Sequence, residues 1–252
     1  MKYLFLINFK TYQEASGKKA IQLAGKIFSI RKKGWTIAVA PSLLDVEEVC
    51  KLKGMVFAQH VDSSEYGAHT GQITPLQLKQ LGAKGTILNH SERKLSWKVL
   101  QQTVLECQKV KLITVVCAST LAEIKKVASL HPNYIAYEPA ALIGGDISVT
   151  SSKPDIIEKA AQVVRKISPR TKLLCGAGVH SQADVQKALE LGAEGVLVAH
   201  AVVKAKEPTK MIEKLLADKK TNWEKLANQI KKAQKDPQFI KEVNKFIKAT
   251  TS

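Results

Sequence analysis

The chain has 252 residues, of which 45% are hydrophobic, and this is enough to bury one large core. It shows no signal peptide, no long apolar run and no C-x-x-C pair among its four cysteines, so we expect a cytoplasmic protein with no membrane partner. The formal net charge of +17 at pH 7 favours an anionic partner, either a phosphorylated small molecule or nucleic acid.

Eight short runs of β-branched or apolar residues recur along the chain, separated by segments with helical spacing. Strict alternation of strand and helix predicts parallel strands, because each return crossover needs a helix's worth of residues. Eight such units predict an α/β fold, a (β/α)8 barrel with a C-terminal helical extension, and a doubly wound open sheet is the alternative. The expected strands are residues 3–9, 36–40, 55–59, 86–89, 112–117, 134–138, 172–175 and 196–199.

Several of the intervening segments carry helix signals. The first has an apolar stripe at one-turn spacing, made of Ala20, Leu23, Ala24, Ile27 and Phe28. Two later segments have the spacing of a capping box, Thr120-x-x-Glu123 and Ser181-x-x-Asp184, and Gly192 is the expected end of the second helix.

In a barrel of this kind the reacting groups lie at the carboxyl ends of the strands, so the residues that end each run are the candidates. Glu138 ends the sixth run, because Pro139 denies that strand its next backbone donor. The seventh and eighth runs end in small residues, whose bare N–H groups suit a phosphate. The other strand ends of interest are Asn8-Phe9-Lys10, Asn89-His90-Ser91-Glu92-Arg93, Gly176-Ala177-Gly178 and Ala199-His200-Ala201.

The segment after Glu138 is apolar where most loops are polar. It reads Ala140-Ala141-Leu142-Ile143 and closes on Gly144-Gly145, which is typical of a lid that exposes backbone N–H groups to a ligand. With Lys10 as a fixed positive charge, His90 as a donor or acceptor and Glu138 as a base, the pattern predicts acid–base chemistry on an anion.

Three motifs resemble those of the triosephosphate isomerase family in their order and spacing. They are Asn8-Phe9-Lys10, Asn89-His90-Ser91-Glu92-Arg93, and Tyr137-Glu138-Pro139 with Ile143-Gly144. The turn Cys175-Gly176-Ala177-Gly178 is similar to the short archaeal type of that family. The resemblance covers about residues 1–218 and implies a TIM barrel enzyme that uses no cofactor and no metal. Its implied reaction interconverts D-glyceraldehyde 3-phosphate and dihydroxyacetone phosphate through an enediol(ate), in glycolysis and gluconeogenesis.

The resemblance also implies residue roles, in a family that is itself a standard example of paired acid–base groups. Glu138 moves the proton between C1 and C2, neutral His90 polarises the carbonyl, and Lys10 and Asn8 stabilise the enediolate. Glu92 pairs with Lys10. Ser91 and Thr70 support the site. The implied substrate-binding residues are Asn8, Phe9, Lys10, Ile143, Gly144, Gly178, Ala199 and His200.

Thr70 lies at the tip of residues 67–71, which resemble the loop that reaches a neighbouring subunit's active site in this family. The resemblance therefore implies a homo-oligomer, either a dimer or a tetramer.

Three features depart from the family pattern. Asp146 stands where the family has a second lid glycine, Ala140-Ala141 replaces bulkier lid residues, and His200 replaces glycine or serine. We expect them to affect phosphate affinity and lid motion rather than the type of reaction. For His200 we expect only the backbone N–H to face the phosphate, because a large side chain must turn outward to leave room; a pH-sensitive imidazole contact is the alternative.

Residues 219–252 lie outside the resemblance and follow a catalytic domain of residues 1–218. Thr221-x-x-Glu224 is a capping box and Asp236-Pro237 opens a second apolar-faced segment, so we expect a helical hairpin. The tail has nine lysines against three acidic residues, which we interpret as a solvated face rather than a surface for RNA or membrane.

Other functions fit the sequence less well. A metal-dependent hydrolase would need ligands at a strand end, and His60-Val61-Asp62 is the nearest candidate. A Schiff-base aldolase needs a buried lysine where the sixth run carries Glu138. A dinucleotide-binding protein needs the motif G-x-G-x-x-G. Gly176-x-Gly178 has the first two glycines, but Ser181 stands at the position of the third. A nucleic-acid-binding module would interleave aromatic residues with its lysines, so we expect no nucleic-acid partner.

Overall fold

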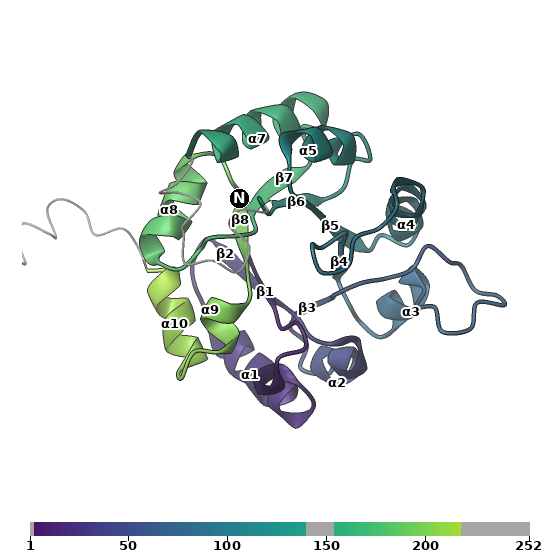
Figure 1. Ribbon diagram of the computed structural model, residues 1–252. Helices are drawn as coiled ribbons and strands as arrows, with labels where there is room; N and C mark the ends of the chain where they lie inside the picture. Colours follow the sequence, from purple (N-terminus) through teal and green to yellow (C-terminus); the bar gives the residue numbers. More distant parts are fainter. Residues whose placement is uncertain (1–2, 140–153, 218–252) are drawn as a thin grey trace, which may run out of the picture. The chain divides into compact units, whose positions relative to one another are not determined.

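The computed structural model describes residues 3–139 and 154–217, and its strands form a closed barrel (Figure 1). All neighbouring strands are parallel and follow one another in sequence order, and β1 pairs with β8 to close the ring. This closure excludes the doubly wound open sheet. The strands are β1 (Tyr3–Asn8), β2 (Trp35–Ala40), β3 (Met55–Ala58), β4 (Gly85–Leu88), β5 (Ile113–Ala118), β6 (Tyr134–Tyr137), β7 (Lys172–Cys175) and β8 (Gly195–Val198).

Each strand begins and ends within one residue of the position expected from the sequence. Helices lie around the ring of strands (Figure 1). The described α-helices are α1 (Lys18–Ser29), α2 (Val46–Cys50), α3 (Pro75–Gln80), α4 (Trp97–Lys109), α5 (Leu121–Ala128), α7 (Pro154–Ile167), α8 (Gln182–Glu190), α9 (His200–Val203) and α10 (Pro208–Leu215). Two 3₁₀ turns, η1 (Gln13–Ala15) and η2 (Leu43–Asp45), follow β1 and β2.

The apolar residues form two cores because successive side chains of a strand point to opposite faces. On β1, Leu4 and Leu6 belong to the cluster inside the barrel, and Phe5 and Ile7 pack outward against the helices. The inner cluster also contains Ala38, Ala40, Phe57, Ile87, Val115, Cys117, Ala136, Leu174 and Leu197. Continuing this alternation by two residues turns the next side chains of β1 and β6, Asn8 and Glu138, into the mouth of the barrel.

Most of the expected helix signals are confirmed. The stripe of α1 is buried at Ala20, Leu23, Ala24 and Ile27. Ser181 and Asp184 form a complete capping box at α8. The box expected at α5 is only half formed: Thr120 accepts the N–H of Glu123, but the Glu123 carboxylate bonds to Ser119 and Asn89 instead of closing the box.

Two further segments bear on the function. The long connection between β3 and α3 leaves the barrel as an extended excursion (Figure 1).

The barrel belongs to a unit of Met1–Leu216, and the hairpin expected at residues 219–252 lies outside the described residues. Within residues 3–139 and 154–217, none of the helices has the length and apolar character needed to cross a membrane.

Candidate active site

A cavity of about 400 Å³ opens where the strands end at their carboxyl side. Its wall contains Asn8, Lys10, His90, Ser91 and Glu138, together with the turns after β7 and β8. Thus residues from the ends of β1, β4, β6, β7 and β8, which are far apart in the sequence, line one space. This is the place in an α/β barrel where chemistry is expected.

Glu138 is held at the centre of this cavity. Its backbone N–H donates to the Ala118 carbonyl at 2.8 Å, so the parallel ladder extends just beyond β6. Its side chain is buried, with 5% of the residue exposed. A Cβ atom placed on Gly176 would lie 2.6 Å from the Glu138 Cγ, so only glycine at that position leaves room for the carboxylate.

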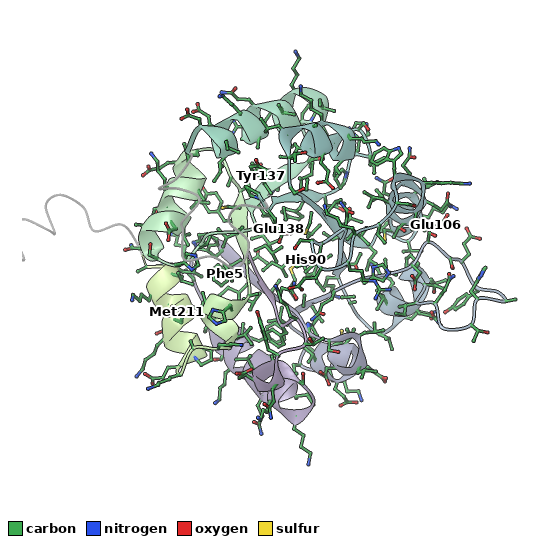
Figure 2. The ribbon with its side chains drawn as sticks, in the orientation of Figure 1. Phe5, His90, Glu106, Tyr137, Glu138 and Met211 are labelled. Carbon is green, nitrogen blue, oxygen red and sulfur yellow. The ribbon has the colours of Figure 1, made fainter. Side chains whose placement is uncertain are left out.

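His90 lies against Glu138. Its Nε2 is 3.4 Å from Glu138 Oε1, and Figure 2 shows both side chains at the centre of the ring of strands. Its Nδ1 accepts the backbone N–H of Glu92 at 3.2 Å. A ring nitrogen that accepts a hydrogen bond carries no proton, so this contact favours the tautomer with the proton on Nε2. The ring therefore presents an N–H donor to the cavity.

Lys10 supplies a positive charge to the cavity wall. Its Nζ is 2.6 Å from Glu92 Oε1, which is the pairing expected from the sequence. Its backbone is left-handed, with φ of 48°, and two hydrogen bonds hold it there: the Lys10 N–H donates to Asn8 Oδ1 at 2.9 Å, and Gln59 Nε2 donates to the Lys10 carbonyl at 2.9 Å. Asn8 therefore positions Lys10 as well as lining the cavity.

Two polar atoms of the cavity wall are buried without a partner in the described part of the protein. They are Glu138 Oε2 and Ser91 Oγ. An unpartnered carboxylate oxygen in a buried position is costly to stability, and it is left available to an incoming ligand. The same atoms are the ones that a substrate in this cavity could satisfy.

Cys117 lies beneath the carboxylate, inside the barrel. Burial raises the pKa of its thiol well above the ordinary value, and the negative charge of Glu138 and a hydrogen bond to it raise it further. The thiol therefore stays neutral, so it adds no second negative charge beside Glu138.

The turns after β7 and β8, where the sequence predicts a phosphate site, form part of the cavity wall. Gly178, Ala199 and His200 all line the cavity, and Gly178 has a positive φ of 67° that suits glycine. Phe9 differs from the expectation: its side chain is fully buried in the outer core and does not face the cavity, because β1 alternation points it away from the barrel mouth. Thr70 lies exposed on the excursion between β3 and α3 and does not line this cavity.

The lid lies outside the described residues. Ile143 and Gly144, together with the departures at Ala140-Ala141 and Asp146, fall within residues 140–153. Their roles therefore remain sequence predictions.

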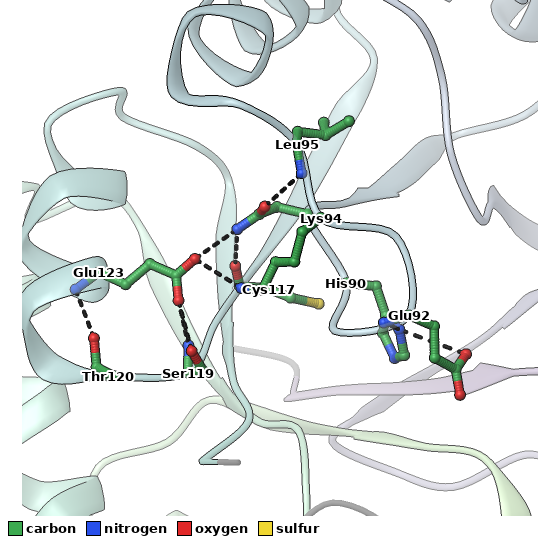
Figure 3. A network of polar contacts seen from close by, with 9 residues as sticks. His90, Glu92, Lys94, Leu95, Cys117, Ser119, Thr120 and Glu123 are labelled. Atoms are coloured by element: carbon green, nitrogen blue, oxygen red, sulfur yellow. Dashed lines mark hydrogen bonds and ion pairs between the residues drawn. The ribbon is translucent and has the colours of Figure 1, made fainter.

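The structure adds residues that the sequence reading missed. Tyr12 and His180 line the cavity, two residues beyond Lys10 and Gly178 respectively, so a wider window at each strand end would have found them. Asn89 anchors the loop that carries His90: its Nδ2 donates to the Cys117 carbonyl at 2.9 Å and to Glu123 at 2.8 Å (Figure 3). No local pattern points to Glu123 as its partner, because the two residues belong to different β/α units.

The candidate metal ligands of the sequence bond to each other. His60 Nε2 lies 3.1 Å from Asp62 Oδ1, and Asp62 Oδ2 accepts the N–H of Ile73 at 2.9 Å, which closes the base of the excursion. In the described ranges, no group of three or more His, Cys, Asp or Glu residues is placed to hold a metal ion.

Known proteins are similar to this chain over the whole barrel. A family model described as triosephosphate isomerase matches residues 3–215. The triosephosphate isomerase of Methanocaldococcus jannaschii is 39% identical over 215 residues, which are 84% of this chain and 98% of that protein. That of Methanothermus fervidus is 37% identical over 217 residues, 85% of this chain and 98% of that protein. That of Methanopyrus kandleri is 38% identical over 216 residues, 84% of this chain and 96% of that protein. With the closed barrel and its acid–base groups in place, the chain belongs to the triosephosphate isomerase family.

Proposed function

We propose that Glu138 is the base that moves a proton between C1 and C2 of a triose phosphate. The chain is an isomerase of its family, which interconverts D-glyceraldehyde 3-phosphate and dihydroxyacetone phosphate in glycolysis and gluconeogenesis. The observation that carries the assignment is the Glu138 carboxylate, buried, adjacent to a neutral imidazole and with one oxygen unpartnered in the described cavity.

The reaction begins with a substrate whose carbonyl oxygen accepts the Nε2–H of His90. Glu138 removes a proton from the carbon next to the carbonyl, and the electron pair of that C–H bond forms the enediolate C=C bond while the carbonyl electrons move to oxygen. His90 relays the proton between the two oxygens, and Glu138 returns its proton to the other carbon. The aldose and the ketose have the same oxidation level overall, so the proposal needs no redox cofactor.

Lys10 stabilises the negative charge that develops on the enediolate. Its ammonium group is held in place by Glu92 before the substrate arrives, so little reorganisation is needed during the reaction. The backbone N–H groups around Gly178 and the Ala199-His200 pair, with Gly144 of the lid, bind the phosphate. Asn8 orients the Lys10 backbone and contacts the substrate from the same wall.

The test is Glu138→Asp, with triose phosphate interconversion measured by a coupled assay. The shorter side chain keeps the charge but withdraws the base by about 1 Å, so we expect kcat to fall by about 100-fold or more. Glu138→Gln, which cannot accept the proton, should lose more. Near-normal turnover of Glu138→Asp would reject Glu138 as the base. A metal chelator should leave kcat unchanged.

We also propose that the protein acts in the cytoplasm as a homo-oligomer, a dimer or a tetramer. The support is the excursion between β3 and α3, with Thr70 exposed and Tyr66 56% exposed. Residues 67–71 of this excursion resemble the loop that reaches a neighbouring subunit in this family, and they are exposed in the single chain. Light scattering of the purified protein measures the mass directly, and a monomer across the working concentration range would reject this part of the proposal.

A further inference from the structure

Tyr12 and His200 meet at the end of the cavity formed by β1 and β8. Their ring centroids are 6.4 Å apart and the rings are inclined by 68°, an edge-to-face arrangement. Both residues line the cavity. The Tyr12 backbone is fixed by the turn η1, since its carbonyl accepts the Ala15 N–H at 2.9 Å and the Ser16 hydroxyl at 3.0 Å. The imidazole therefore packs on an anchored part of the cavity wall.

Lys204 adds a cation to this pair. Its Nζ lies 4.7 Å from the centroid of the Tyr12 ring. Its backbone N–H donates to the His200 carbonyl at 3.1 Å, so the two side chains leave the same face of the helix one turn apart. Two basic side chains thus stand on one aromatic ring beside the turn expected to bind phosphate.

The sequence predicts an imidazole that turns outward, and His200 is exposed, but its ring also contacts Tyr12 of the cavity wall. The contact with Tyr12 keeps the imidazole at the cavity rim, where its protonated form can donate to an anion.

We propose that the imidazole of His200 is a side-chain ligand of the substrate's phosphate, supported by Tyr12 and added to the backbone N–H groups. The ligand class is a tetrahedral dianion. The inference rests on the proposed function, because it takes the turns after β7 and β8 to be the phosphate end of the site.

The charges around His200 give this contact a pH dependence. The ionisable groups around it are Lys204, whose ammonium lies on the Tyr12 ring, and Lys10, Tyr12, His180 and Glu138, which line the same cavity. The ammonium group of Lys10 is already paired with Glu92, so the charge that ligand binding adds beside His200 is that of the dianion, which favours a protonated imidazole. Protonation of the imidazole and binding of the anion therefore favour each other, and affinity rises as pH falls through the range where histidine titrates.

Inorganic sulfate is a suitable probe, because it stays a dianion between about pH 5.5 and pH 8.5, whereas a phosphate monoester gains a proton near pH 6. Its affinity is measured twice: as a competitive inhibition constant and, without turnover, as the rise in melting temperature with sulfate concentration. Wild type should bind sulfate about three- to tenfold more tightly at the acid end than at the alkaline end. His200→Ser and His200→Asn, which cannot gain a proton, should lose most of this slope.

The matched control is His180→Ser, which removes an imidazole from the same cavity wall and should keep most of the wild-type slope. Tyr12→Leu, which removes the supporting ring, should reduce it. Parallel curves for wild type and His200→Ser, or a slope that disappears with His180 instead, would overturn the inference. If the isomerase activity depends on Glu138 but the curves are parallel, only this inference fails. If the slope follows His200 and no isomerase activity is found, the proposed function fails and the anion contact stands.

Discussion

Lys10 shows how a single backbone conformation prepares a charge for catalysis. A left-handed φ costs a residue other than glycine about 1–2 kcal/mol, and it persists only where neighbouring groups enforce it. At Lys10 these groups are the side chains of Asn8 and Gln59, which bond to its N–H and its carbonyl. The result is that the ammonium group leaves β1 toward Glu92 and the cavity instead of toward solvent.

We predict that Lys10→Met folds but has a much lower rate of isomerisation. Methionine keeps the length of the side chain and must adopt the same φ, so the backbone around Asn8 need not change. Losing the charge that stabilises the enediolate should lower kcat by about 100- to 1000-fold, the loss typical of one preorganised electrostatic contact. The measurement is the steady-state rate, with circular dichroism to show that the fold is retained.

The control for Lys10→Met is Glu92→Gln. This change removes the carboxylate that holds the Lys10 ammonium but keeps the backbone N–H that donates to His90 Nδ1. We expect a loss of kcat about tenfold or less. Turnover of Lys10→Met within about threefold of wild type would show that the charge is not needed.

At the scale of elements, the loop after β4 is stabilised by a network that crosses to the next β/α unit. Asn89 Oδ1 accepts the Leu95 N–H at 3.0 Å, while its Nδ2 reaches β5 and α5 (Figure 3). The Glu123 carboxylate also accepts from Lys94 Nζ at 2.7 Å and from the Ser119 N–H at 2.7 Å. One carboxylate on α5 thus fixes the loop that presents His90.

The charge of Glu123 is stabilised in the folded protein. Burial alone would raise the pKa of this carboxyl, but the hydrogen bonds from Lys94 and Ser119 outweigh burial and hold the pKa below its ordinary value. A carboxyl with a lowered pKa stabilises the fold at pH values above the pKa of the unfolded chain. This stability is lost as pH falls through the folded-state pKa.

We therefore predict that Glu123→Gln lowers the free energy of unfolding by about 1–3 kcal/mol near pH 7, because Lys94, Ser119 and Asn89 lose the anionic acceptor of their hydrogen bonds. The difference from wild type should shrink as pH falls below about 4, because wild type then loses the same charge. Urea unfolding at several pH values measures it. The exposed i,i+3 pair of Glu207 and Lys210 provides the control, and Glu207→Gln should cost less than about 1 kcal/mol. A difference that is equal at all pH values would contradict the electrostatic account.

At the scale of the whole molecule, the barrel carries the complete set of described acid–base groups. The residues that match the relative from Methanocaldococcus jannaschii make up 98% of that protein but 84% of this chain. That relative therefore has no room for a counterpart of residues 219–252. The tail is an addition to a barrel that is complete in its relatives without it.

We predict that a chain of residues 1–218 keeps the kcat of the full-length protein to within about threefold, because all eight strand ends lie upstream of the tail. The melting temperature or the oligomeric mass should change instead. Steady-state kinetics, thermal unfolding and light scattering of the two chains test this. Binding of RNA by the full-length chain but not by residues 1–218, with a steep loss of affinity in salt, would contradict the interpretation of the tail as a solvated face.

Local patterns of the sequence predict the elements and the candidate residues for chemistry. Strand and helix periodicities are local patterns, so the eight strands could be placed to within one residue, and Pro139 located Glu138 at the end of a strand. Small residues after the last two strands predicted an anion site for the same local reason. The family resemblance supplied the roles of these residues, which periodicity cannot provide.

Which of these residues contact one another depends on the three-dimensional fold. Closure of β1 on β8 and the register of the strands set the 3.4 Å distance between His90 and Glu138, and they bring Tyr12 against His200. Likewise, the Glu123 carboxylate bonds to Asn89 and Lys94 of the preceding unit, and to Ser119, instead of closing its capping box. A local pattern fixes the direction of a side chain relative to its own element, but the partners on other strands depend on register and closure, which involve residues far apart in the sequence.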